Sequence, residues 1–185
     1  MSDRQLRVVV LVGSLRRESV NRRLAELAVA HAPEQIDVQV AEDLHLLPFY
    51  NEDDDLDGLR DGRVDALRAQ VGEADALLVV TPEYNGGSPA VLRNAIDWLS
   101  RPYGNGALAG LPVGVIGAAL GRYAGTWARE DVRKAAGIAG AQVLAEVELG
   151  LATSGLEEGW AGEPELVDQV TAAVRRLVDE VAVDA

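Results

Sequence analysis

Apolar residues along this chain form short runs, separated by stretches with the spacing of helices. Leu6 to Val12 is a β-branched run, typical of a central parallel strand buried on both faces. Further apolar runs predict strands at Ile36 to Val40, Ala76 to Val80, Val113 to Gly117 and Val143 to Leu149. Ile36 to Val40 alternates apolar and polar residues and therefore fits a more exposed strand.

Between these runs, apolar residues recur at the three- and four-residue spacing of amphipathic helices. The pattern predicts helices from about Asn21 to His31, around Val64 to Val71, from Pro89 to Leu99, from about Thr126 to Ile138, and from Pro164 onward. We expect Ser88 to cap the third helix, with Pro89 at its first position and Pro102 ending it.

Alternating strands and helices imply an α/β protein with a parallel sheet and right-handed crossovers. Five strands predict a doubly wound, flavodoxin-like sheet of order 2-1-3-4-5 with helices on both faces. We expect residues 1–185 to form a single domain, because no linker, repeat or low-complexity tract interrupts the pattern.

Composition narrows the classes of function. Asp and Glu outnumber Lys and Arg by 30 to 17, so the formal charge of −13 argues against a nucleic-acid partner. The chain has no cysteine, which removes disulfides, thiolate nucleophiles and Cys-type metal sites. It shows neither an N-terminal signal segment nor a run near the roughly 20 apolar residues of a membrane span. We therefore expect a cytoplasmic protein without a membrane partner.

The loop from Thr81 to Pro89 is the most informative segment. It directly follows a buried strand, and the carboxyl ends of strands are where open α/β sheets bind ligands. Tyr84 offers a flat face, and Gly86 and Gly87 allow backbone to approach a ligand closely. This loop favours a flat ring with polar edges over a phosphate.

The loop from Gly13 to Asn21 follows the first strand and precedes a helix, whose N-terminal N–H groups favour an anion. Its candidate phosphate ligands are Ser14, Arg16, Ser19 and Asn21. The loop matches neither a Walker A motif nor a dinucleotide fingerprint. An ordinary strand-to-helix turn capped by Ser19 is the alternative.

The two loops are expected to be neighbours, because strands one and three lie side by side in the 2-1-3 order. A phosphate cradle next to a loop suited to a flat ring describes a site for a mononucleotide such as FMN.

On these motifs the chain resembles the NADPH-dependent FMN reductase family, flavodoxin-like proteins that include quinone, chromate and azo-dye reductases. The resemblance rests on Gly13 to Arg16, Ser19 to Asn21, Pro82 to Asn85, Leu92 to Trp98 and Ser100 to Pro102. It covers nearly the whole chain. Family members often have a glycine pair where this chain has Arg122 to Gly125.

The resemblance implies a role for each matching residue. Ser14, Arg16, Ser19 and Asn21 would hold the phosphate and ribityl part of FMN. The isoalloxazine ring would be lined by Pro82, Glu83, Tyr84 and Asn85 and, across the ring, by the loop that begins at Gly117. Arg101 would bind an anionic substrate or join a subunit contact.

The resemblance also implies the reaction. NADPH or NADH would deliver hydride to FMN and leave, and a flavin, quinone or similar small acceptor would then take its place in a ping-pong mechanism. No side chain is then expected to act as a catalytic acid or base. A homodimer or a tetramer of dimers is implied as well.

Two other classes stay open from the residues alone. A flavodoxin-like electron carrier would bind FMN without oxidising NAD(P)H itself. A hydrolase is disfavoured because the chain lacks a Gly-x-Ser-x-Gly elbow. His31 and His45 are isolated, so we expect no metal site, and we interpret Glu52 to Asp55 as a solvated loop.

Overall fold

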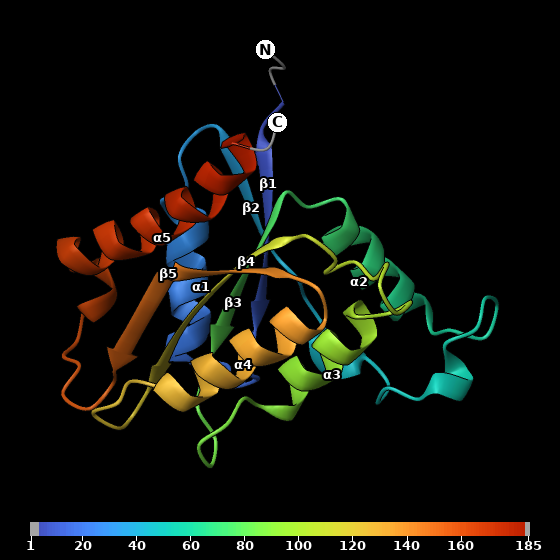
Figure 1. Ribbon diagram of the computed structural model, residues 1–185. Coiled ribbons are helices and arrows are strands. Elements are labelled where there is room, and N and C mark those ends of the chain that lie inside the picture. Colours follow the sequence, from blue (N-terminus) through green and yellow to red (C-terminus); the bar gives the residue numbers. More distant parts are fainter. Residues whose placement is uncertain (1–3, 184–185) are drawn as a thin grey trace.

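The computed structural model describes residues 4–183, in which five strands and five longer helices alternate (Figure 1). The strands are β1 (Leu6–Val12), β2 (Ile36–Val40), β3 (Ala76–Thr81), β4 (Pro112–Ala119) and β5 (Gln142–Ala152). The helices are α1 (Val20–Ala30), α2 (Gly62–Gly72), α3 (Ala90–Leu99), α4 (Thr126–Ile138) and α5 (Pro164–Val183).

The sheet has the order β2-β1-β3-β4-β5, and every neighbouring pair is parallel. The predicted flavodoxin-like order is therefore confirmed. The carboxyl ends of the strands share one edge, at the bottom of Figure 1. The chain reverses its direction across the sheet between β1 and β3, and this is where such sheets form a ligand crevice.

Alternate residues of the central strands face two separate cores. Val8, Val10 and Val12 pack in the core beneath α1 and α5, whereas Val9 and Leu11 pack in the core beneath α2, α3 and α4. Figure 1 shows these two helix layers on opposite faces of the sheet. Burial on both faces explains why Val8 to Val12 of β1 form a continuous apolar run. Within residues 4–183, no helix is both long and apolar enough to cross a bilayer.

The edge strand β5 is longer than its apolar pattern predicts. It extends to Ala152, and its pairing with β4 shifts register between Val113 and Val115. Several of its side chains are exposed, because β5 has a neighbour on one side only. An edge strand with an irregular register loses the regular alternation that reveals a strand in sequence.

The predicted start of the third helix is wrong. Helix α3 begins at Ala90 with Pro89 at the N-cap, and no side chain caps it. Ser88 instead donates its hydroxyl hydrogen bond to the Asp131 carboxylate on α4. Ser19 does cap α1, since its Oγ accepts a hydrogen bond from the Arg22 N–H at 3.3 Å.

The interpretation of Glu52 to Asp55 as a solvated loop is wrong for its last residue. Glu52–Asp54 form an exposed 3-10 turn, but the Asp55 side chain is only 8% exposed. Its carboxylate accepts hydrogen bonds from Arg68 at 2.8 and 3.1 Å and from Arg60 at 3.1 Å. Asp55 thereby joins this loop to α2.

Candidate functional site

A cavity of about 280 Å³ opens where the carboxyl ends of β1, β3 and β4 meet. It collects seven of the nine residues predicted to bind the cofactor: Ser14, Arg16, Ser19, Asn21, Pro82, Glu83 and Tyr84. The two loops singled out in the sequence therefore face one space, as the predicted strand order requires.

The loop between β1 and α1 presents a run of backbone donors. Within the described part of the chain, no backbone N–H of residues 14–21 donates a hydrogen bond to another residue. The Ser14 and Ser19 side chains are buried beside these groups. Unpaired N–H groups at a helix N-terminus, together with hydroxyl groups, form the donor set that a phosphate monoester requires.

Asn21 connects this loop to the end of β4. Its Oδ1 accepts a hydrogen bond from the Ala118 N–H at 2.8 Å, and its Nδ2 donates one to the Ala118 carbonyl at 2.9 Å. One amide N–H of this buried side chain is left for a ligand. The phosphate role expected for Asn21 stays a prediction, and the structure adds a positioning role that the sequence did not reveal.

Arg16 is exposed at the mouth of the cavity. Its guanidinium donates to the Glu18 carbonyl at 3.0 Å and has no carboxylate partner within residues 4–183. A charged fork without a counter-ion at this place can pair with an anionic ligand.

The loop after β3 is a tight hairpin-like turn. Tyr84 and Gly87 form an antiparallel bridge, while Asn85 and Gly86 have φ values of 53° and 72°. Two successive residues at positive φ are typical of a type I′ turn, which favours the Asn-Gly pair found here. Asn85 was expected to line the ring but lies in this turn and is absent from the cavity wall. Tyr84 is half exposed at the cavity.

Gly117 was expected at the end of the fourth strand, where the loop across the ring begins, but β4 continues to Ala119 and pairs Gly117 with Thr81. A Cβ atom at this position would collide with the Thr81 carbonyl, so the glycine lets the two strands approach. The β4 side of the cavity is instead formed by Ala118, Ala119 and Leu120.

Glu83 performs a structural task in addition to lining the cavity. Helix α4 begins after Gly125 without a side-chain cap of its own. The Glu83 carboxylate accepts a hydrogen bond from the Ala128 N–H at 3.2 Å and thus caps α4 from the neighbouring loop. This contact joins the loop after β3 to the start of α4.

An aromatic pair follows the β4 side of the cavity. The Tyr123 and Trp127 rings have centroids 5.1 Å apart, and both side chains are about half exposed. The Arg122 guanidinium lies 4.7 Å from the Tyr123 ring centroid. The sequence indicated Arg122 to Gly125 as a departure from the family, but it did not reveal that Tyr123 packs against Trp127.

Arg101 lies away from this cavity. Its guanidinium is 3.4 Å from the Glu52 carboxylate and 3.7 Å from that of Asp55, and it contributes to a separate cavity of about 400 Å³ beside α3 and α4. A role in binding the substrate at the strand ends therefore gains no support from its position. The subunit contact stays a prediction.

Comparisons with known proteins point the same way. A family model described as NADPH-dependent FMN reductase matches residues 6–155. The chain is 41% identical over 128 residues to a 2-hydroxy-1,4-benzoquinone reductase from a Burkholderia species, which covers 69% of this chain and 68% of that protein. It is 38% identical over 134 residues to an NAD(P)H-dependent FMN reductase from Pseudomonas aeruginosa. This match covers 72% of this chain and 70% of that protein. The solved structure of FerB, a flavoenzyme NAD(P)H:(acceptor) oxidoreductase from Paracoccus denitrificans, matches with a TM-score of 0.85 and 28% identity over 96% of this chain and 98% of that one.

Proposed function

Because the chain belongs to the NADPH-dependent FMN reductase family, we propose that it uses FMN to pass electrons from NAD(P)H to quinones, free flavin or similar small acceptors in a ping-pong sequence. The observation that carries the proposal is the single cavity in which a donor-rich loop faces the Tyr84 loop. FMN has a phosphate at one end and a flat ring at the other, which matches these two walls.

The residues of the β1–α1 loop fit the phosphate end. The free N–H groups of residues 14–21 and the Ser14 and Ser19 hydroxyls would bind the phosphate oxygens, and Arg16 would neutralise their charge. Asn21 holds this loop in register with Ala118, so the donors are positioned before the ligand arrives.

The ring end fits the loop after β3. Tyr84 and Pro82 provide flat and apolar surface. Within the described residues, the backbone N–H groups of Glu83, Asn85 and Gly86 have no protein acceptor. Such donors would stabilise negative charge that develops on the polar edge of the ring. Bound FMN supplies the hydride chemistry, so this chain needs to supply only orientation, charge and exclusion of water.

The aromatic pair suggests where the acceptor lies. Tyr123 and Trp127 give a partly exposed apolar surface next to the β4 side of the cavity, and Arg122 adds a positive charge. A planar quinone can stack on such a surface. Relatives named as quinone reductases support this class of acceptor.

Initial rates test the mechanism. NADPH and a benzoquinone are varied against each other with the FMN-loaded protein, and the proposal predicts parallel double-reciprocal lines because the donor leaves before the acceptor binds. Intersecting lines would contradict the ping-pong sequence. Absence of NADPH oxidation in a protein that binds FMN would favour an electron carrier instead.

We also propose that two copies of the chain pair through α3 and α4. Ile138 and Tyr103 are 76% and 88% exposed beside the 400 Å³ cavity that Arg101 helps to line. Large apolar side chains gathered around a surface cavity are typical of an interface. A dimer, or a tetramer of dimers, would bury them.

A further inference from the structure

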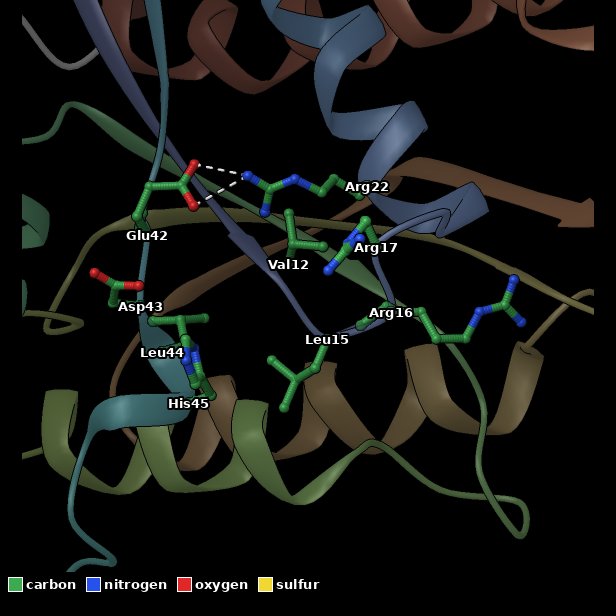
Figure 2. Close-up of a pocket in the computed structure, with 11 residues that line it drawn as sticks. Val12, Leu15, Arg16, Arg17, Arg22, Glu42, Asp43, Leu44 and His45 are labelled. Carbon is green, nitrogen blue, oxygen red and sulfur yellow. Dashed lines mark hydrogen bonds and ion pairs between the residues drawn. The ribbon is translucent and has the colours of Figure 1, made fainter.

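A second cavity at the carboxyl edge of the sheet, of about 300 Å³, lies on the opposite side of the β1–α1 loop. It is called the second cavity below and is distinct from the one beside α3 and α4. It is bounded by the end of β1, the start of α1 and the segment that follows β2, as Figure 2 shows. Ser14 and Arg16 line both this cavity and the one assigned to FMN. The two spaces are therefore neighbours that share one loop as a wall.

The charge in this second cavity differs from that of the molecule as a whole. Arg17 and Arg22 line it in a chain with a formal charge of −13. Arg17 is exposed and has no carboxylate partner among the described residues. In Figure 2 its guanidinium lies between Arg22 and Leu15, with the other lining side chains.

Arg22 is held in place by Glu42, and its Nε lies 4.0 Å from the carboxylate of Glu26. One guanidinium nitrogen of Arg22 donates to both carboxylate oxygens of Glu42, at 3.0 Å each. The second terminal nitrogen carries no hydrogen bond within residues 4–183, and Figure 2 shows it on the side of Val12, away from the carboxylate. Asp43, the other acid of this wall, points away from both arginines in the same view. Two guanidinium groups thus offer donors to one anion.

We propose that this cavity binds the phosphate-bearing adenosine end of the electron donor, and that Arg17 and Arg22 make the protein prefer NADPH over NADH. The inference rests on the proposed function. A dinucleotide whose nicotinamide lies over the flavin must place its other half beyond the FMN cavity, and the shared Ser14–Arg16 wall leads into this one. The 2′-phosphate of NADPH carries close to two negative charges at neutral pH, which matches the guanidinium of Arg17 and the remaining terminal nitrogen of Arg22.

The remaining wall suits a nucleoside. Leu15, 62% exposed, lies at the rim opposite Arg22 in Figure 2, and Leu44 and His45 continue the surface. Leu15 and His45 are exposed and provide apolar and flat area for a base, whereas Leu44 is only 5% exposed. NADH lacks the 2′-phosphate and therefore cannot form the charge-assisted hydrogen bonds to Arg17 and Arg22, which would stay hydrated.

The FMN phosphate is the other phosphate monoester that could occupy this cavity, and the experiment separates the two sources. The Arg17→Ala variant is compared with Arg23→Ala, which removes the same charge from α1. Arg23 is ion-paired with Glu26 at 2.9 Å and is absent from the wall of the second cavity. Three quantities are measured for each variant: the dissociation constant of FMN, calorimetric binding of adenosine 2′,5′-bisphosphate and of 5′-AMP to the FMN-loaded protein, and kcat/KM with NADPH and with NADH.

The inference predicts that the wild-type protein binds the 2′,5′-bisphosphate about tenfold or more tightly than 5′-AMP, and that Arg17→Ala removes most of this difference. The ratio of kcat/KM for NADPH to that for NADH falls by a similar factor in Arg17→Ala and stays constant in Arg23→Ala. Three results would overturn it: an equal loss in both variants, an unchanged ratio in Arg17→Ala, or a loss confined to FMN affinity. If neither donor is oxidised, the proposed function fails, and the binding isotherms still decide whether the cavity recognises the 2′-phosphate.

Discussion

At the scale of single residues, the least expected feature is the buried carboxylate of Asp55. Arg68 and then Arg60 hold the pKa of this group below its ordinary value through hydrogen bonds and charge, against the opposing effect of burial. The ion pair therefore stabilises the fold at pH values above the ordinary carboxyl pKa of about 3.9. This stabilisation is lost as the pH falls through the lowered pKa.

Asp55→Asn should lower the free energy of unfolding at pH 7 by about 3 kcal/mol, because it leaves Arg68 and Arg60 without their shared counter-ion. Asp57→Asn is the matched control: Asp57 also pairs with Arg60, at 3.0 Å, but its side chain is 99% exposed. We expect Asp57→Asn to lower the free energy of unfolding by less than about 1 kcal/mol. Urea unfolding at pH 7 and at pH 3 measures both. The difference between Asp55→Asn and wild type should shrink at the lower pH, and a constant difference would contradict the assignment.

Gly117 supports a second prediction at this scale. Gly117→Ala places a methyl group against the Thr81 carbonyl. It should lower the free energy of unfolding by about 2 kcal/mol or more, since the backbone of β3 cannot move aside easily. Gly121→Ala adds the same group where no atom lies within 4 Å and should change stability by less than about 0.5 kcal/mol. Thermal and urea unfolding compare the two. Equal stability of both variants would disprove the close approach.

At the scale of elements, the crevice depends on contacts between loops and the helices next to them. Glu83 caps α4, Asn21 joins α1 to β4, and Asp131 on α4 accepts hydrogen bonds from the Ser88 hydroxyl and from its backbone N–H at 3.2 Å. The Ser88 hydrogen bonds also lower the pKa of the Asp131 carboxyl. Ser88 thus anchors the end of the loop that carries Tyr84.

Ser88→Ala removes the charge-assisted hydrogen bond from this hydroxyl and should lower stability by about 1.5 kcal/mol. It should also weaken FMN binding severalfold, because the loop that is proposed to line the ring loses its anchor. Ser100→Ala is the control, since the Ser100 hydroxyl donates to the Asp97 carbonyl at the far end of α3. Fluorescence titration with FMN compares them. Unchanged FMN affinity in Ser88→Ala would show that the loop does not depend on Asp131.

The elements were the most predictable part of the molecule. Buried parallel strands read as apolar runs, so all five strands and their order followed from the sequence, and the Ser19 cap and Pro164 start were also correct. The predicted start of α3 was wrong, because Ser88 hydrogen-bonds to Asp131 on α4, far along the chain, and so does not cap α3. The role of Asp55 was also missed, because its acidic neighbours suggest a solvated loop while Arg68, one of its partners, lies on α2.

At the scale of the whole molecule, the strand order decides which loops meet. It brings the β1 and β3 loops to one cavity, which explains why seven of the nine predicted cofactor residues line it. Asn85 and Gly117 lie outside this wall, in a tight turn and a close strand contact, and their cofactor roles stay predictions. The net charge of −13 does not describe this edge of the sheet, where Arg16, Arg17 and Arg22 line the two cavities.

The proposed pairing of two copies is tested at the same scale. Ile138→Asp puts a charge into the exposed apolar surface beside α3 and α4 and should shift the sedimentation coefficient toward that of a 19.6 kDa monomer. Val29→Asp makes the same change on α1, where Val29 is 43% exposed, and should leave the assembly intact. A wild-type protein that sediments as a monomer would disprove the pairing.

The central claim is that the β1–α1 and Tyr84 loops bind a flavin that NAD(P)H reduces. The most direct test is the visible absorbance spectrum of the FMN-loaded protein, recorded without oxygen before and after one equivalent of NADPH and again after a quinone is added. We predict that the flavin bands bleach with NADPH and return with the quinone. A protein that fails to bind FMN, or whose bound FMN keeps its spectrum in the presence of both NADPH and NADH, would contradict the account.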